Sequence, residues 1–229
     1  MVSLYTYIIP VDDGAAPNPF HGMCTLAICK PTIRRTAKTG DWIVGLGSKN
    51  APKKRDLSGR MVYAMRVDDK ITMQEYDSKA KVNWPHRIPN IKSMELQKRL
   101  GDNIYDYSNG APTQRASVHK KENIETDLNG KYVLISRHFY YFGCNAIKLP
   151  KALLTKIIHQ EQGHRSKSNE PYVDEFVKWI ESSDHSIGQL YGWPDFTIDW
   201  KDSSRCGVCS TRKREAENDN PIETSNHAC

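Results

Sequence analysis

Short runs of β-branched and aromatic residues, each closed by a turn, constrain the fold of this chain more than any other feature. Residues 3–9, 42–47 and 61–67 are such runs, and they predict strands because these side chains suit the half-buried surface of a sheet. Residues 23–29 form a further apolar run that fits a buried strand or a short helix. Residues 131–142 predict one or two more strands.

Amphipathic helices are predicted toward the C-terminus. Pro150 suits the first position of one helix, and the apolar residues between Leu153 and Ile158 line one face of it. Pro171 opens a second helix in the same way, and the Thr72–Glu75 pattern predicts a capping box before an earlier one. Strands followed by helices predict an α+β fold with a mostly antiparallel sheet, and we expect five or six short strands to curl into a small barrel with flanking helices.

Length and composition predict a single domain. The chain has 229 residues, which fits one domain over residues 1–200. Residues 201–229 are polar, and we expect them to be a disordered tail. The spacing of two cysteines in this tail is that of a zinc knuckle, although a second pair is missing. The weak candidates for zinc ligands are Cys206, Cys209, His227 and Cys229. We expect no cofactor.

Apolar residues are too dispersed for a membrane protein. No stretch approaches the ~20 apolar residues that a spanning helix needs, and no secretory leader is recognisable. Cys24, Cys29 and Cys144 lie in apolar contexts that are typical of buried free thiols. We therefore expect a cytoplasmic protein with no membrane partner.

Positive charge is concentrated in two segments. The net charge is +6, but residues 30–60 carry nine cations and two anions, and residues 79–99 carry six cations and one anion. Such an imbalance favours an anionic partner, with nucleic acid or a nucleotide as the leading class. The alternative is a solvated basic face with no partner.

A turn-rich acidic loop follows the first predicted strand. Asp12 and Asp13 stand beside Gly14, and Asn18 and Phe20 lie in a Pro-Asn-Pro-Phe turn. Such a loop can hold polar groups that read the edge of a base and an aromatic ring that stacks on it. The alternative is an Asx-turn whose carboxylate faces solvent.

Basic and aromatic residues alternate after this loop. Arginine presents a planar fork of donors that suits phosphate, and tryptophan can stack on a base, although Trp42 also has the spacing of a core residue. The glycines at 45 and 47 are suited to wrapping an anion, but the sequence is not a Walker A motif. The residues predicted to bind a ligand or nucleic acid are Asp12, Asp13, Asn18, Phe20, Lys30, Arg34, Arg35, Trp42, Ser48, Lys49, Lys53, His138 and Tyr140.

The segment from 136 to 143 is rich in aromatic residues. In a strand, His138, Tyr140 and Phe142 share one face, so one face is core and the other is a candidate pocket wall. His138 is either a structural histidine or an acid/base group. No metalloprotease, serine-hydrolase, Rossmann or deaminase motif is present.

The N-terminal block as a whole resembles the nucleotide modification associated domain 2 family. The resemblance rests on residues 5–14, 16–20, 24–31 and 33–45, and it is supported by the aromatic stretch that ends at Gly143. It covers roughly residues 3–200, and it implies a nucleotide theme linked to DNA modification and phage–host conflict. The Gly40–Gly45 pattern and the 62–67 strand are similar, at the level of fold, to PUA-like, ASCH and EVE domains, which are small β-barrels that in several cases bind RNA or modified bases.

Three functions are therefore considered. The first is a binding module that recognises a modified or flipped base. The second is an enzyme acting on modified nucleotides or DNA by glycosidic or phosphodiester cleavage, with Asp12 or Asp13 and His138 as catalytic residues. The third is a protein-interaction or phage counter-defence factor.

Overall fold

The computed structural model describes residues 1–52, 55–159 and 163–194. The predictions that fall outside the described residues are those for Lys53 and for the tail with its zinc candidates Cys206, Cys209, His227 and Cys229.

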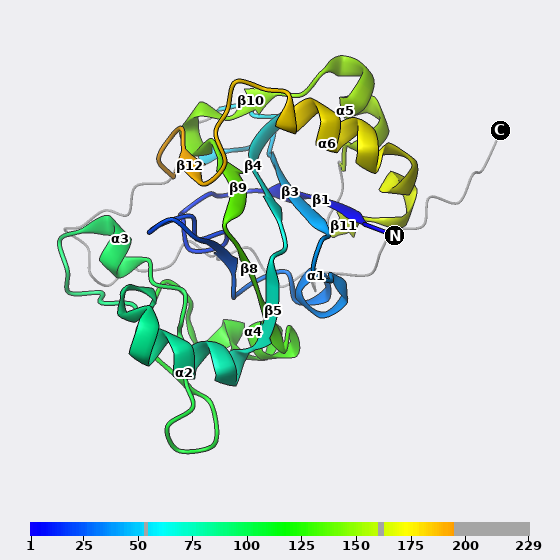
Figure 1. The fold of residues 1–229 in the computed structure, drawn as a ribbon. Helices are drawn as coiled ribbons and strands as arrows, with labels where there is room; N and C mark the ends of the chain where they lie inside the picture. The colour runs from blue at the N-terminus through cyan, green and yellow to red at the C-terminus, as the bar shows by residue number, and fades with distance from the viewer. Residues whose placement is uncertain (53–54, 160–162, 195–229) are drawn as a thin grey trace.

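A mixed sheet forms the centre of the fold (Figure 1). Its strand order is β11-β1-β3-β4-β9-β12, with β10 beside β4. β1 runs parallel to β3, and β9 runs parallel to β12, whereas the other neighbours are antiparallel. The strands of this main sheet are β1 (Leu4–Ile9), β3 (Trp42–Gly47), β4 (Arg60–Arg66), β9 (His138–Tyr141), β10 (Ile147–Lys148), β11 (His164–Arg165) and β12 (Gln189–Leu190).

A second, smaller sheet packs against the first. Its order is β2-β8-β5, and both pairings are antiparallel. Only Arg137 separates β8 from β9, so the chain passes from one sheet to the other at this residue. The remaining strands are β2 (Cys24–Leu26), β5 (Asp69–Thr72) and β8 (Tyr132–Ser136), together with the hairpin of β6 (Tyr105–Asp106) and β7 (Thr113–Gln114).

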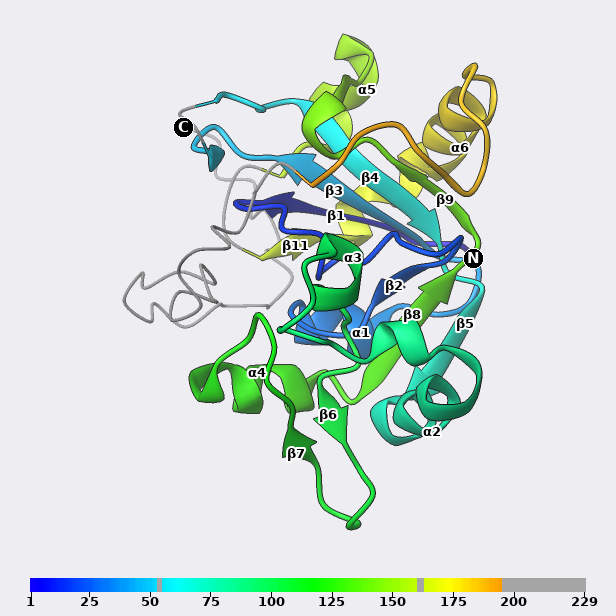
Figure 2. The same ribbon diagram turned by 90° about the vertical axis from the view of Figure 1, so that its left-hand side faces the viewer.

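Helices cover the outer faces of the two sheets (Figure 2). α5 and α6 pack on the main sheet, and α2 and α4 lie beyond the second sheet. Three apolar clusters fill the resulting layers, and the middle cluster lies between the sheets. The helices are α1 (Pro31–Thr36), α2 (Met73–Asn83), α3 (Leu96–Arg99), α4 (Ile124–Asn129), α5 (Lys151–Ile157) and α6 (Val173–Glu181). Short 3₁₀ turns occur at Pro85–Arg87, Lys121–Asn123, Gly143–Asn145 and Lys167–Tyr172.

The α+β class is confirmed, but the predicted barrel is not. The described strands form open sheets, and the two ends of the main sheet, β11 and β12, do not pair with each other. The capping box at Thr72 is confirmed, because Glu75 N–H donates to Thr72 Oγ1 and Thr72 N–H donates to the Glu75 carboxylate. Within the described part of the chain, every helix is too short or too polar to cross a bilayer.

Candidate active site

Cys29 occupies a tight turn between β2 and α1. Its φ is +58° and that of Lys30 is +39°, both in the left-handed region that side chains other than glycine rarely adopt. Pro31 then begins α1. A sharp turn between a strand and a helix is a recurring position for a catalytic nucleophile, because the turn exposes the side chain. Backbone strain of this kind clusters at functional sites.

His119 faces the Cys29 thiol. Its Nε2 lies 3.4 Å from Cys29 Sγ, and its Nδ1 lies 2.6 Å from Asp127 Oδ2. Since a carboxylate accepts hydrogen bonds, Nδ1 carries the proton, and Nε2 is left to receive one from the thiol. Nucleophile, base and orienting carboxylate thus stand in sequence, which is the geometry that activates a cysteine.

The Asp127 carboxylate accepts three hydrogen bonds. Its Oδ1 accepts from the N–H of Cys29 at 2.9 Å, and its Oδ2 accepts from His119 and from the Tyr105 hydroxyl at 3.0 Å. The Cys29 sulfur, a His119 ring nitrogen and an Asp127 carboxylate oxygen lie within 4.8 Å of one another. These three atoms could also be the ligands of a metal ion. A metal ion bound to the carboxylate would have to displace these hydrogen bonds, and the arrangement therefore favours a thiol nucleophile.

Arg34 holds the main chain at Cys29 and at Asp127 through hydrogen bonds. Its guanidinium is fully buried and donates to the carbonyl oxygens of Cys29, Ala27, Asp127 and Tyr132. Burial lowers the pKa of Arg34, and the nearby Asp127 partly opposes that shift. The sequence-based prediction that Arg34 contacts phosphate is therefore wrong, since the side chain is enclosed and its donors are spent on the backbone.

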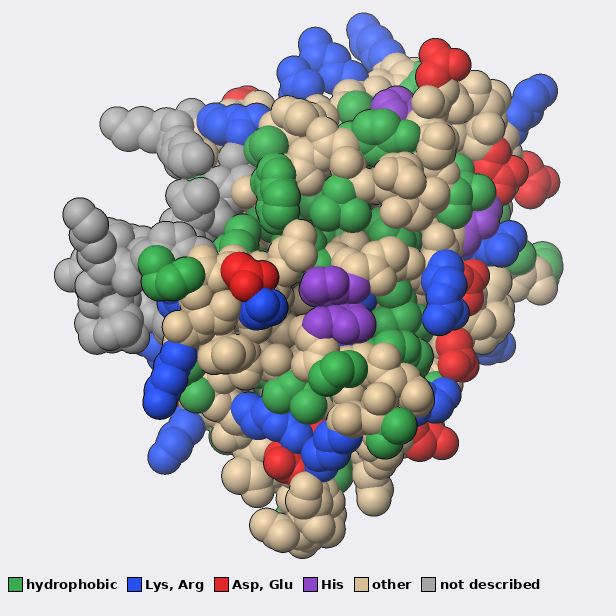
Figure 3. Space-filling view, turned by 60° about the vertical axis from the view of Figure 1, so that its left-hand side comes forward, with side chains coloured by type: hydrophobic (Ala, Val, Ile, Leu, Met, Phe, Trp, Pro, Cys, Tyr) green, Lys and Arg blue, Asp and Glu red, His purple; other side chains and the backbone are tan. Residues whose placement is uncertain are grey.

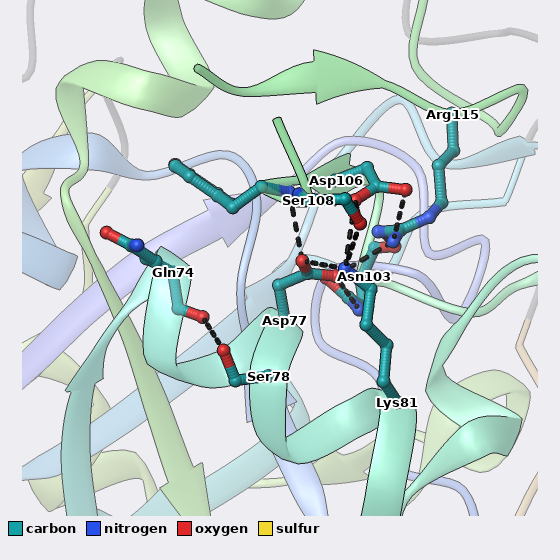
Figure 4. A network of polar contacts seen from close by, with 9 residues as sticks. Gln74, Asp77, Ser78, Lys81, Asn103, Asp106, Ser108 and Arg115 are labelled. Carbon is teal, nitrogen blue, oxygen red and sulfur yellow. Dashed lines mark hydrogen bonds and ion pairs between the residues drawn. The ribbon is translucent and has the colours of Figure 1, made fainter. Parts of the chain in front are cut away.

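A polar network holds the segment that leads to His119 (Figure 4). Asp77 on α2 accepts hydrogen bonds from Asn103, from the N–H of Tyr107 and from Lys81 and Arg115. Hydrogen bonds also shape the backbone beyond β7, where the Gln114 amide donates to the carbonyls of His119 and Lys120. His119 therefore lies on a segment that is attached to α2 by hydrogen bonds.

Comparison with known proteins adds a family to this geometry. The family model described as nucleotide modification associated domain 2 matches residues 1–203. The chain belongs to this family. No curated protein and no solved structure matches it. The family ties the chain to nucleotide modification, and the triad lies within the matched range.

In this member of the family, the acidic loop lies near the triad, because Ala15 packs in the same apolar cluster as Ile28 and Val118. Asp13 accepts from the N–H of Ala15 at 2.9 Å. Burial raises the pKa of Asp13, and that hydrogen bond and the charge of the nearby His119 act in the opposite direction. Asp12 is buried and accepts from the Tyr141 hydroxyl at 2.6 Å.

Lys30, the residue after Cys29, extends over the ring of the buried Tyr7. The Tyr7 hydroxyl shares a 2.9 Å hydrogen bond with that of Tyr63, and Lys30 Nζ lies 5.1 Å from the centroid of the Tyr7 ring. Burial raises the pKa of Tyr7, and Cys29 adds to that shift. Lys30 is the predicted ligand-binding cation that the structure brings to this site.

The other predicted residues of the acidic loop are structural. Asn18 is buried, donates to the carbonyl of Leu100 and accepts from Arg87. Phe20 is enclosed in the cluster beyond the second sheet. Because neither side chain is open to a ligand, the prediction that Asn18 reads a base and Phe20 stacks on one is corrected.

Trp42 and His138 lie on the far face of the main sheet. Trp42 is only 2% exposed and packs edge-on against His138 and Phe176. Tyr140 shares this face, whereas Asp12 contacts Tyr141 on the opposite one. The sheet therefore separates His138 from the acidic loop, and the predicted acid/base pair is not formed. Trp42 and Tyr140 are core residues rather than stacking surfaces.

The remaining predicted contacts lie apart from the triad thiol. Arg35 donates to the carbonyl of Asn129 and to Thr32. Ser48 accepts from the N–H of Asn50 within a turn, and Lys49 is exposed. Sequence reasoning missed His119 and Asp127, and it treated Cys29 as a buried thiol, although this cysteine is only half-buried. The position of Cys29 just before a helix-opening proline was the one signal for it.

Proposed function

We propose that this chain is an enzyme of nucleotide modification that uses Cys29 as its nucleophile. The observation that carries the proposal is the His119 ring, which stands between the Cys29 thiol and the Asp127 carboxylate at 3.4 Å and 2.6 Å. Membership of the nucleotide modification associated domain 2 family supplies the substrate theme. The enzyme alternative is thus retained with a different set of catalytic residues.

The triad supports a two-step group transfer. His119 accepts the thiol proton through Nε2 while Cys29 Sγ forms a bond to an electrophilic centre of the substrate, and the bond to the leaving group breaks. The imidazolium returns its proton to the leaving group. In the second step, His119 takes a proton from water or an acceptor hydroxyl, whose oxygen bonds to the transferred group while the bond to Cys29 Sγ breaks, and the proton returns to the thiolate. Asp127 keeps the ring oriented and offsets its charge.

Recognition of a base without chemistry is less well supported. That interpretation relied on Trp42 for stacking and on Arg34 for phosphate, and both side chains are enclosed. Neither can reach a ligand unless the core opens.

Alkylation of the thiols by iodoacetamide tests the triad without knowledge of the substrate. We expect Cys29 to react faster than Cys144 at neutral pH, because His119 can accept the thiol proton as the sulfur attacks. Cys144 is the internal control, since it is also half-buried and its Sγ contacts only the Asn145 side chain among the described hydrogen bonds. Peptide mapping by mass spectrometry gives the rate at each cysteine.

Two variants make this test decisive. Asp127→Asn and His119→Gln should slow alkylation of Cys29 by roughly 10–10²-fold and leave Cys144 unchanged. Thermal unfolding and circular dichroism show whether each variant is folded. Equal rates at Cys29 and Cys144 in the wild type would refute the nucleophile.

Turnover is tested with nucleotide pools. The protein is incubated with cellular nucleoside phosphates and with modified and plain DNA, and products are followed by mass spectrometry. Cys29→Ser should abolish any product that Cys144→Ser still forms. Activity that survives Cys29→Ser would contradict the proposal.

A further inference from the structure

A hollow opens beside the base of the triad. It has a volume of about 420 Å³ and is formed largely by the segment that carries His119. That volume lies within the range of pockets that hold one small ligand, roughly 300–1,000 Å³. Its polar lining includes Gln114, Arg115, Ser117, His119, Lys120 and Lys121.

We propose that this hollow binds the phosphate of a free mononucleotide next to His119. The inference rests on the proposed function and names the substrate class of the same site. His119 lines the hollow and also belongs to the triad, so a ligand seated here lies next to the residue that supplies the base.

Two lysines are the phosphate partners. Lys120 and Lys121 are exposed, and the 3₁₀ turn Lys121–Asn123 follows directly. The guanidinium of Arg115 is engaged by Asp77 at 2.8 Å and Asp106 at 3.1 Å, so it shapes the wall instead of binding the anion. Glu122 is the acidic residue of the lining, which leaves the hollow with a net positive charge.

The rest of the hollow suits a nucleoside. Ile91 and Ala116 offer apolar surface, and the Gln114 side chain offers its carbonyl oxygen beside it. The Gln114 amide holds the carbonyls of His119 and Lys120, so the backbone of this wall is ordered before a ligand binds. A preformed wall lowers the entropic cost of binding.

A polymer is a poorer fit than a single nucleotide. All four arginines of the basic segment from 30 to 60 donate to main-chain carbonyls, with Arg34 buried and the others bound to Asn129, Cys144 and Ala146. On the face shown in Figure 3, lysine and arginine side chains are scattered among acidic and neutral ones and form no continuous stripe. Nucleic-acid binding draws on a run of cations along the phosphate backbone.

Calorimetry on the full-length Cys29→Ser variant tests the inference. The probes are the four deoxynucleoside 5′-monophosphates, the matching nucleosides, inorganic phosphate and a single-stranded oligonucleotide. We expect at least one monophosphate to bind more tightly than its nucleoside and than the oligonucleotide. Lys120→Glu and Lys121→Glu should each weaken it about tenfold, which corresponds to 1.4 kcal/mol.

Lys178→Glu is the matched control. Lys178 is exposed on α6, on the opposite side of the main sheet, so this variant changes the net charge equally without touching the hollow. Its affinity for the monophosphate should equal that of the parent protein.

Where a probe binds, three results would overturn the inference. They are equal affinity for nucleoside and monophosphate, the same affinity in the Lys120 and Lys178 variants, and a preference for the oligonucleotide. Absence of binding by every probe also overturns it, yet it leaves the nucleophile in place if Cys29 still alkylates rapidly. Slow alkylation of Cys29 together with tight binding of a monophosphate would refute the nucleophile and support the binding site. The two proposals can therefore fail separately.

Discussion

Arg34 connects the core to the Cys29 turn mainly through hydrogen bonds to backbone oxygens. Its donors meet the carbonyls of Cys29 and Asp127, so one buried side chain sets the relative position of the nucleophile and the orienting carboxylate. Gly130 makes room for it, because a Cβ at this position would overlap the guanidinium. The backbone of Gly130 is helical, with φ near −65°, so only space is at issue.

Gly130→Ala should therefore destabilise the protein through steric conflict with Arg34. We expect a loss of about 3 kcal/mol in the free energy of unfolding, at the upper end for overpacking in a core. Alkylation of Cys29 should slow as well, because displaced Arg34 releases the carbonyl of Cys29. Urea unfolding and peptide mapping measure the two effects.

Gly110→Ala is the control for Gly130→Ala. Gly110 has φ of +83° and open space around its Cβ position, so the substitution costs only the backbone term of about 1 kcal/mol. If both variants lose the same stability, or if alkylation of Cys29 is unchanged in Gly130→Ala, the proposed clamp is wrong.

At the scale of elements, α2 holds the β6–β7 hairpin through charge. Lys81 donates to Asp77 at 2.6 Å and to Asp106 at 2.9 Å, and Arg115 pairs with the same two carboxylates. Burial of Asp77 opposes ionisation, but its hydrogen bonds from Lys81, Tyr107, Asn103 and Arg115 together lower its pKa. Hydrogen bonds from Ser108 and Lys81 lower the pKa of Asp106.

This network should make stability depend on pH. A carboxylate with a lowered pKa in the folded state stabilises the fold above its unfolded pKa of about 3.9, and this contribution is lost as pH falls through the folded value. Asp77→Asn should thus lower the free energy of unfolding at pH 7. The gap to the wild type should shrink below about pH 4. Urea titrations between pH 2 and 7 measure it.

Asp174→Asn is the matched control, since Asp174 is an exposed carboxylate on α6. It should leave the stability at pH 7 nearly unchanged. A gap between Asp77→Asn and the wild type that stays constant down to pH 2 would show that the network is not held by charge.

The elements themselves were largely predictable, but their partners were not. The apolar runs at 3–9, 42–47 and 61–67 became β1, β3 and β4, because alternating or buried apolar side chains report local structure. The aromatic stretch after 131 splits between two sheets at Arg137, and nothing local marks that division. Pairing depends on contacts between distant segments, and this is why the expected barrel became two open sheets.

At the scale of the whole molecule, the site is assembled from three distant segments. The acidic loop was expected to be functional, and its Ala15 packs in the same apolar cluster as Ile28 and Val118, the neighbours of Cys29 and His119 in the chain. Cys29 and His119 are 90 residues apart and belong to no spacing motif, so a single sequence cannot pair them. The burial of Arg34 was equally hidden, because arginine is seldom fully buried and its partners here are main-chain carbonyls.

Tyr141 anchors the acidic loop to the middle layer between the two sheets. Its hydroxyl donates to the buried Asp12 at 2.6 Å, and burial raises its pKa, with Asp12 adding to the shift. Tyr141→Phe removes a hydrogen bond to a carboxylate, and such bonds contribute about 1.5–3 kcal/mol. We expect a loss of about 2 kcal/mol in urea unfolding and little change in the alkylation of Cys29, since Asp12 is not part of the triad.

Tyr63→Phe gives the comparison that isolates this charge. Tyr63 lies on the same sheet face and is equally buried, but its hydroxyl meets the neutral hydroxyl of Tyr7 at 2.9 Å. A neutral pair contributes about 1 kcal/mol, so Tyr63→Phe should cost about half as much as Tyr141→Phe. Equal losses in the two variants would mean that Asp12 is held by its loop alone, and that the loop reaches the triad without support from the main sheet.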